Sequence, residues 1–159
     1  MPWSVHSGKT TLLQVLADSS SPPASTVPTV GMNVRTAKRG NVKMKLWDLG
    51  GQRQYRGEWV RYTSGCDCIV FVVDAFDVHR IGEAKKELHV LLDEPSLATT
   101  PILVVANKID LEPHLRRDEL IHELNLDYIT ESRWAIQPIS ALRRTNIMPV
   151  IEWLTAKGK

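Results

Sequence analysis

Long apolar runs are absent from this 159-residue sequence. No stretch approaches the about 18 consecutive apolar residues of a membrane-spanning helix, and the amino terminus lacks the charged and apolar segments of a secretion signal. Pro2 follows Met1, where N-myristoylation would need glycine, so we do not expect that lipid anchor. We therefore expect a protein that does not span a membrane.

Cysteine is scarce as well, since Cys66 and Cys68 are the only two. They lie too close together for an ordinary disulfide, and no further cysteine or histidine follows at the spacing of a zinc site. We predict two structural thiols in a reducing compartment.

A strong excess of either charge is also missing. Twenty basic and eighteen acidic side chains leave a net charge of +2, which does not favour nucleic acid or an anionic membrane as the main partner. The hydrophobic share of 43% is that of an ordinary globular protein. Without internal repeats or linkers, residues 1–159 are predicted to form a single domain.

Apolar residues follow two periodicities along the chain. Continuous runs rich in β-branched residues predict strands buried on both faces at Cys68–Val73, Ile102–Ala106 and Trp134–Ile139. Helical spacing follows each run, at Ile81, Ala84, Leu88, Leu91 and Leu92, at Leu120, Ile121 and Leu124, and at Val150, Ile151 and Leu154. This alternation predicts an α/β fold, a mostly parallel sheet with helices on both faces.

The segment from Met32 to Leu49 breaks the alternation. Two strand-like stretches flank Arg39-Gly40-Asn41, whose Gly-Asn pair favours a tight turn, so we predict an antiparallel β-hairpin. In the second stretch apolar residues alternate with lysines and Trp47, which puts Trp47 on the outward face as a candidate contact surface. The alternative, that Trp47 lies under a neighbouring helix, fits the pattern as well.

A phosphate-binding segment is predicted at Ser7-Gly8-Lys9-Thr10-Thr11. It opens a helix with an apolar face, which is where a phosphate loop places its Gly-Lys-Thr. Backbone amides at the helix start would bind phosphates, Lys9 would reach the β- and γ-phosphates, and the Thr10 hydroxyl would ligate Mg²⁺. Alone, this short piece fits an ordinary helix start equally well.

A second element, Trp47-Asp48-Leu49-Gly50-Gly51-Gln52, ends the predicted hairpin. Asp48 is suited to hold Mg²⁺ through a water molecule, Gly51 lets a backbone N–H approach the γ-phosphate, and Gln52 is suited to orient the attacking water. A strand followed by a glycine turn would explain the glycines, but not the order of lysine, aspartate and glutamine around them.

The third element, Asn107-Lys108-Ile109-Asp110, follows a predicted buried strand at the edge where open α/β sheets bind ligands. Asp110 can accept guanine N1–H and the exocyclic amine, which adenine does not offer, while Asn107 meets the ring edge and Lys108 lies over the base. Ser140-Ala141-Leu142 adds a candidate backbone N–H for guanine O6. The alternative is a polar loop with a helix cap.

Thr29 ends a segment that reads as a mobile loop, Ser19 to Thr26 being its low-complexity part. A threonine there would bind Mg²⁺ and the γ-phosphate only when GTP is present, so the loop would have an ordered and a released state. We predict that this change is a switch.

With these elements in view, the chain from Ser7 onward resembles the Arf and Arf-like branch of Ras-type small GTPases. The resemblance rests on three sequence features: Pro28-Thr29-Val30-Gly31, Trp47 to Gln52, and Trp59. Arg61-Tyr62 and Glu87 to Pro95 are most similar to the lysosome-associated eighth Arf-like branch. The resemblance implies a Ras-like P-loop GTPase fold and a switch that binds GTP or GDP with Mg²⁺ and hydrolyses GTP slowly.

The resemblance also implies partners and a location. Met32, Trp47 and Tyr62 match an effector-reading triad, with methionine where phenylalanine is usual, which would alter partner choice. The implied partners are an exchange factor, a GTPase-activating protein and effectors such as motor adaptors or tethers. The implied location is cytoplasmic, at late-endosomal or lysosomal membranes.

Two features depart from the family pattern. Trp3 stands where the full phosphate-loop pattern has glycine, and the family's amphipathic helix and first β-strand would precede this chain. That strand lies centrally in a Ras-type sheet, so its loss would leave ladder groups unpaired. We expect an amino-terminally truncated isoform, an alternative start or an incomplete gene model, lacking the helix used for membrane attachment.

Three hypotheses for function follow from the sequence. The first is a GTP-hydrolysing molecular switch, and the second is a non-catalytic interaction module with impaired nucleotide binding. The third, a small nucleotide kinase, shares the phosphate loop but does not need the Asp48 to Gln52 or Asn107 to Asp110 elements.

Overall fold

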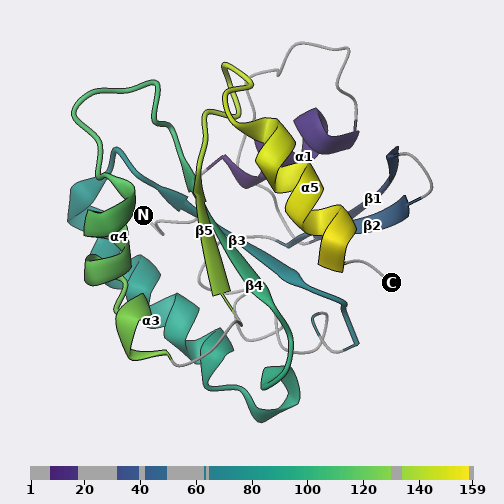
Figure 1. Ribbon diagram of the computed structural model, residues 1–159, viewed down its shortest axis with the longest axis horizontal. Helices are drawn as coiled ribbons and strands as arrows, with labels where there is room; N and C mark the ends of the chain where they lie inside the picture. Colours follow the sequence, from purple (N-terminus) through teal and green to yellow (C-terminus); the bar gives the residue numbers. More distant parts are fainter. Residues whose placement is uncertain are drawn as a thin grey trace.

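The strands of the computed structural model, which describes residues 8–17, 32–39, 42–49, 63, 65–129 and 134–157, form two sheets (Figure 1). The first is an antiparallel pair, β1 (Met32–Arg39) and β2 (Val42–Leu49). The second is parallel, with the order β3 (Ile69–Asp74), β4 (Ile102–Asn107) and β5 (Trp134–Pro138). The predicted α/β class, with one hairpin beside a parallel sheet, is confirmed.

Four α-helices accompany these strands in the described residues: α1 (Lys9–Ala17), α3 (Ile81–Leu92), α4 (Arg117–Glu123) and α5 (Ile147–Lys157). Three short 3₁₀ helices, η3 (Val78–Arg80), η4 (Pro95–Leu97) and η5 (Leu126–Tyr128), shape the connections. In Figure 1, α3 and α4 lie on one side of the parallel sheet, and α1 and α5 lie on the other.

Alternate residues of the central strands feed two separate cores. Val104 of β4 packs in the cluster with α3 and α4, whereas its neighbours Leu103 and Val105 pack in the cluster with α1 and α5. This is the period of two expected of a strand covered on both faces. All six residues of β4 are buried, so it is the central element of this layer.

The helical spacing read from the sequence is confirmed for α3 and α5. The buried residues of α3 are Ile81, Ala84, Leu88, Leu91 and Leu92. In α5 the predicted residues are buried together with Ile147. In α4, Leu120 is buried and Ile121 is half-buried, while Leu124 caps the helix.

The last predicted strand packs on both faces, with Trp134 and Ile136 in the cluster of α3 and α4 and Ala135 in the cluster of α1 and α5. In β5 only Ile136 is buried and the other four residues are half-buried, and the strand ends at Pro138, one residue earlier than predicted. Within the described residues β5 pairs with β4 alone, so it is an edge strand, a position that tolerates Pro138, and the next residue, Ile139, still donates its N–H to Ala106 O at 2.8 Å.

The hairpin is antiparallel as predicted; Met32 pairs with Leu49, and Arg39, which was predicted to lie in the turn, pairs with Val42. The turn residues Gly40 and Asn41 lie outside the described residues, as do the side chains of both strands, so the outward position of Trp47 stays a prediction. Helix α1 packs against both β1 and β2.

No strand among the described residues pairs with both β2 and β3. The segment before Gly8 lies outside the described residues, so the prediction of a missing first strand stays a prediction. In the same described ranges no helix has the length and hydropathy needed to cross a membrane.

Candidate nucleotide-binding site

The polar ends of two neighbouring strands coincide in register. Asp74, the last residue of β3, pairs with Asn107, the last residue of β4. Their backbones continue together, since Ala75 N–H donates to Asn107 O at 2.9 Å and Leu115 N–H donates to Ala75 O at 2.8 Å. Parallel strands bring their carboxyl ends to one edge, so the residues that follow converge there.

Asn107 is a buried polar residue with a defined partner. Its side chain is 3% exposed, and its Oδ1 accepts the Ala141 N–H at 3.0 Å. It also lies against Gly8, where an added Cβ would overlap Asn107 Nδ2. Asn107 thus joins the start of α1 to the loop after β5.

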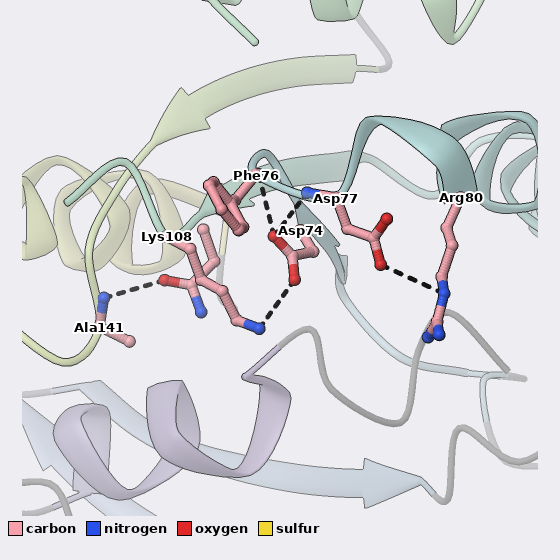
Figure 2. A network of polar contacts seen from close by, with 7 residues as sticks. Asp74, Phe76, Asp77, Arg80, Lys108 and Ala141 are labelled. Carbon is pink, nitrogen blue, oxygen red and sulfur yellow. Dashed lines mark hydrogen bonds and ion pairs between the residues drawn. The ribbon is translucent and has the colours of Figure 1, made fainter. Parts of the chain in front are cut away.

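Lys108 is fixed at both its backbone and its ammonium group. Its φ is 71°, a left-handed conformation that is costly for a residue with a Cβ, and its carbonyl accepts the Leu111 N–H at 3.1 Å. Its Nζ donates to Asp74 Oδ2 at 2.7 Å, and Figure 2 shows the two side chains pointing toward each other. The lysine side chain is 29% exposed and the aspartate 13%, so the pair is partly withdrawn from water.

Asp74 is a site residue that the sequence reasoning missed. Its Oδ1 accepts the N–H groups of Phe76 at 2.9 Å and Asp77 at 3.2 Å, while its Oδ2 accepts from Lys108 (Figure 2). One feature of the sequence could have indicated it: Asp74 is a polar residue that directly follows a buried apolar run, as Asn107 is in the next strand.

Asp110 and Ser140 are joined directly. Ser140 Oγ donates to Asp110 Oδ1 at 2.7 Å and accepts the Arg143 N–H at 3.0 Å. Ser140 is completely buried, while Asp110 is exposed. Because an ionised carboxylate offers about four lone-pair positions, the bond from Ser140 leaves Asp110 further acceptor capacity.

Helix α1 begins beside this cluster. Gly8 has a φ of 89°, and its carbonyl accepts the Leu12 N–H at 2.9 Å as the first helical bond. A helix start concentrates partial positive charge and favours bound anions. Asn107 therefore lies between an anion-favouring helix start and the loop that carries Ser140 and Ala141.

This arrangement matches known proteins in sequence and in fold. The family described as "Arf: ADP-ribosylation factor family" matches residues 5–157. The chain belongs to the ADP-ribosylation factor family. It is similar to "ADP-ribosylation factor-like protein 8b" of Arabidopsis thaliana, with 41% identity over 154 residues that cover 97% of this chain and 83% of the relative.

A solved structure of a small GTPase is similar to this chain in fold. It is "Structure of the Arl6 BBS3 Small GTPase from Trypanosoma brucei with bound nucleotide analogue GppNp", with a TM-score of 0.86 and 28% identity, covering 95% of this chain and 90% of that chain. The Ras-like small GTPase fold predicted from the sequence is thereby confirmed, as is the assignment to the Arf family.

Several predicted site residues of this Arf-family chain lie outside the described residues, namely Ser7, Thr29, Gly51, Gln52 and Tyr62. Met32, Trp47 and Asp48 are placed by backbone only, in β1 and β2, and the side chain of Thr10 is likewise not described. Their roles stay predictions, whereas Gly8, Asn107, Lys108, Asp110, Ser140 and Ala141 are brought together.

The residues of this Arf-family chain that were predicted to hold Mg²⁺ fit that ion chemically. Thr10, Asp48 and Thr29 would offer hydroxyl and carboxylate oxygens, the ligands that Mg²⁺ prefers. Thr10 is in the first turn of α1 and Asp48 is the next-to-last residue of β2, and these two elements pack together.

The two cysteines lie at the opposite end of β3 from Asp74, just before Ile69. Both are half-buried free thiols. Burial raises the pKa of Cys66, and burial together with the negative charge of neighbouring groups raises the pKa of Cys68 to about 11. Both thiols therefore stay protonated at neutral pH, as the predicted structural role requires.

Proposed function

We propose that this chain binds GDP and GTP with Mg²⁺ and acts as a molecular switch that hydrolyses GTP slowly. The observation that carries the proposal is the direct bond between Ser140 Oγ and Asp110 Oδ1. It orients an exposed carboxylate at the carboxyl edge of the sheet, beside the buried amide of Asn107. The N1–H and exocyclic amine of guanine are the complementary donors.

The remaining groups of the cluster fit the other parts of the nucleotide. The start of α1 would receive the phosphates, with Lys9 supplying positive charge to the β- and γ-phosphates. The stem of Lys108 would cover the base. Gln52 would orient the water that attacks the γ-phosphorus, whose bond to the bridging oxygen then breaks, and bound Mg²⁺ would supply charge neutralisation.

Slow hydrolysis makes regulators necessary. The sequence places no arginine clearly as an internal finger, so a GTPase-activating protein would accelerate the reaction and an exchange factor would replace GDP. Effectors would read the hairpin through Met32 and Trp47, together with Tyr62. The resemblance of Arg61-Tyr62 and Glu87 to Pro95 to the lysosome-associated Arf-like branch supports a role for the switch in membrane traffic at late-endosomal or lysosomal membranes.

Competition binding tests the nucleotide proposal. Purified chain with Mg²⁺ and a fluorescent GDP would be titrated with GTP, GDP, ATP and inosine triphosphate. GTP and GDP should displace the probe at far lower concentration than ATP, and inosine triphosphate, which lacks the exocyclic amine, should fall between them. Equal displacement by GTP and ATP would overturn guanine recognition.

Hydrolysis needs a separate measurement. Phosphate release in single-turnover reactions should be slow and should fall further in Gln52→Leu, while GTP affinity is retained. Release that is unchanged in Gln52→Leu would remove Gln52 from the mechanism and leave binding untouched.

A second candidate function is an interaction module with weak nucleotide affinity. It is favoured by Trp3, which stands where the full phosphate-loop pattern has glycine. Retention of GDP through gel filtration, together with Gln52-dependent phosphate release, would eliminate it.

A further inference from the structure

We propose that Asp74 is a positioning residue for guanine binding, which acts by holding the side chain of Lys108 in the place it occupies over the base. This inference rests on the proposed function and deepens it. The observation behind it is the 2.7 Å ion pair between Lys108 Nζ and Asp74 Oδ2 at the edge of the sheet (Figure 2).

Asp74 is itself rigidly held. It ends β3 in register with Asn107, and its Oδ1 receives two backbone N–H bonds, from Phe76 and Asp77. Only Oδ2 faces the lysine. One carboxylate oxygen of Asp74 therefore binds its own loop, and the other binds Lys108. Because the loop holds the carboxylate in place, it also fixes the direction in which the Lys108 side chain extends.

The backbone of Lys108 is equally constrained. Asn107 O accepts from Ala75, Ile109 N–H donates to Ile139 O at 3.2 Å, and Lys108 has left-handed φ. With both the Cα and the ammonium fixed, the four-carbon stem between them has few remaining conformers. A flat apolar stem that is ordered before the base arrives does not lose that freedom on binding.

The neighbouring aspartate provides a natural comparison. Asp77 lies three residues further along, and its Oδ2 pairs with Arg80 Nε at 3.2 Å, away from Lys108 (Figure 2). The two carboxylates share one short loop and similar chemistry, yet only Asp74 reaches the lysine. A general effect of negative charge on this loop would be shared by both, whereas positioning of Lys108 belongs to Asp74 alone.

The test is a double-mutant cycle on the full chain, using fluorescent GDP with Mg²⁺. Asp74→Asn keeps an Oδ1 acceptor for the two backbone N–H groups and removes the charge that holds the ammonium. It should weaken GDP binding about three- to tenfold, the change expected when one long side chain must be ordered on binding. Lys108→Met should weaken binding, and adding Asp74→Asn to it should have no further effect.

Asp77→Asn is the matched control and should leave affinity unchanged. The inference is overturned if Asp74→Asn binds as the wild type does, if its effect persists in the Lys108→Met background, or if Asp77→Asn has the same effect. Failure of the wild-type chain to bind GDP would instead overturn the proposed function and this inference with it.

Folding is monitored by circular dichroism for each variant. If Asp74→Asn melts below the assay temperature, Asp74→Ser takes its place in the cycle, since its hydroxyl oxygen can still accept a local N–H bond. The expected dependence on Lys108 is the same. If Asp74→Asn weakened binding only by destabilising the fold, its effect would remain in the Lys108→Met background. If it acts by positioning Lys108, its effect disappears in that background.

Discussion

Gly8 lies so close to Asn107 that a Cβ on the glycine would overlap Nδ2 of the asparagine. The glycine starts α1 and the asparagine ends β4. This contact ties the proposed phosphate end of the site to the proposed base end. It also makes the glycine necessary for two separable reasons, a positive φ and a lack of room.

A series of glycine-to-alanine substitutions separates these two reasons. Gly8→Ala suffers both the positive φ of 89° and the overlap with Asn107. It should destabilise the fold by about 2–5 kcal/mol, the sum of backbone strain and overpacking, and weaken GDP binding. Urea unfolding and probe titration measure the two effects.

Gly65 and Gly82 are the controls for this series. Gly65 has a φ of 80° but open space around its Cβ position, so Gly65→Ala should cost only about 1–2 kcal/mol. Gly82 lies in α3 with open space, so Gly82→Ala should stabilise by about 0.5–1 kcal/mol. Equal losses at Gly8 and Gly65 would show that the overlap with Asn107 costs nothing.

Ser140→Ala should lower both stability and guanine preference. The substitution removes a donor to Asp110 and an acceptor for the loop N–H of Arg143, and both bonds are partly buried. Unfolding free energy should fall by about 1–3 kcal/mol, and the ratio of GDP to ADP affinity should decrease. Thr155→Ala removes an exposed hydroxyl bond within α5 and should change stability by less than about 0.5 kcal/mol.

The two sides of α3 should respond very differently to truncation. Leu88 is completely buried in the cluster beneath α3 and α4, so Leu88→Ala should cost about 2–5 kcal/mol. Val90 is 59% exposed, and Val90→Ala should stay within about 0.5 kcal/mol of the wild type. Chemical denaturation of both variants checks the helix orientation, and a large loss at Val90 would contradict it.

The raised pKa of Cys68 makes stability depend on alkaline pH. Burial favours the neutral thiol, so its contribution is fully present below the ordinary pKa of 9.0 and is lost as pH rises through about 11 in the folded state. Urea unfolding at several values between pH 8 and 11 should show a decline that is shallower in Cys68→Ala. Identical declines would mean that other groups account for the whole effect.

Much of the fold could be predicted because apolar patterns are local. The run from Ile102 to Ala106 has no polar residue, which predicts a buried strand. Apolar residues from Ile81 to Leu92 recur at helical spacing, which predicts a helix. The edge position of β5 could not be read in this way. Whether a strand is central or at an edge depends on which strands pair with it, and Pro138 is the one residue of this run that favours an edge position.

In the candidate site too, local motifs could be predicted from the sequence, whereas contacts that depend on strand pairing could not. The spacing of Asn107, Lys108 and Asp110 predicts a guanine-binding loop, and the structure places these residues with Ser140 and Ala141. The contact of Asp74 with Lys108 was invisible because it depends on the register between β3 and β4. One aspartate among 18 acidic residues has no local feature that reveals a partner 34 positions away.

The loop that carries Ser140 is closed on itself by two backbone bonds. Thr145 N–H donates to Ser140 O at 2.9 Å, and Ser140 N–H donates to Thr145 O at 3.2 Å. Inside this ring Ala141 is buried, while Leu142 is 59% exposed. A fluorescent dye attached at position 142 would therefore be held by this closed loop, next to the proposed base-binding residue Ala141. Its fluorescence would report nucleotide exchange in cells or in reconstituted systems.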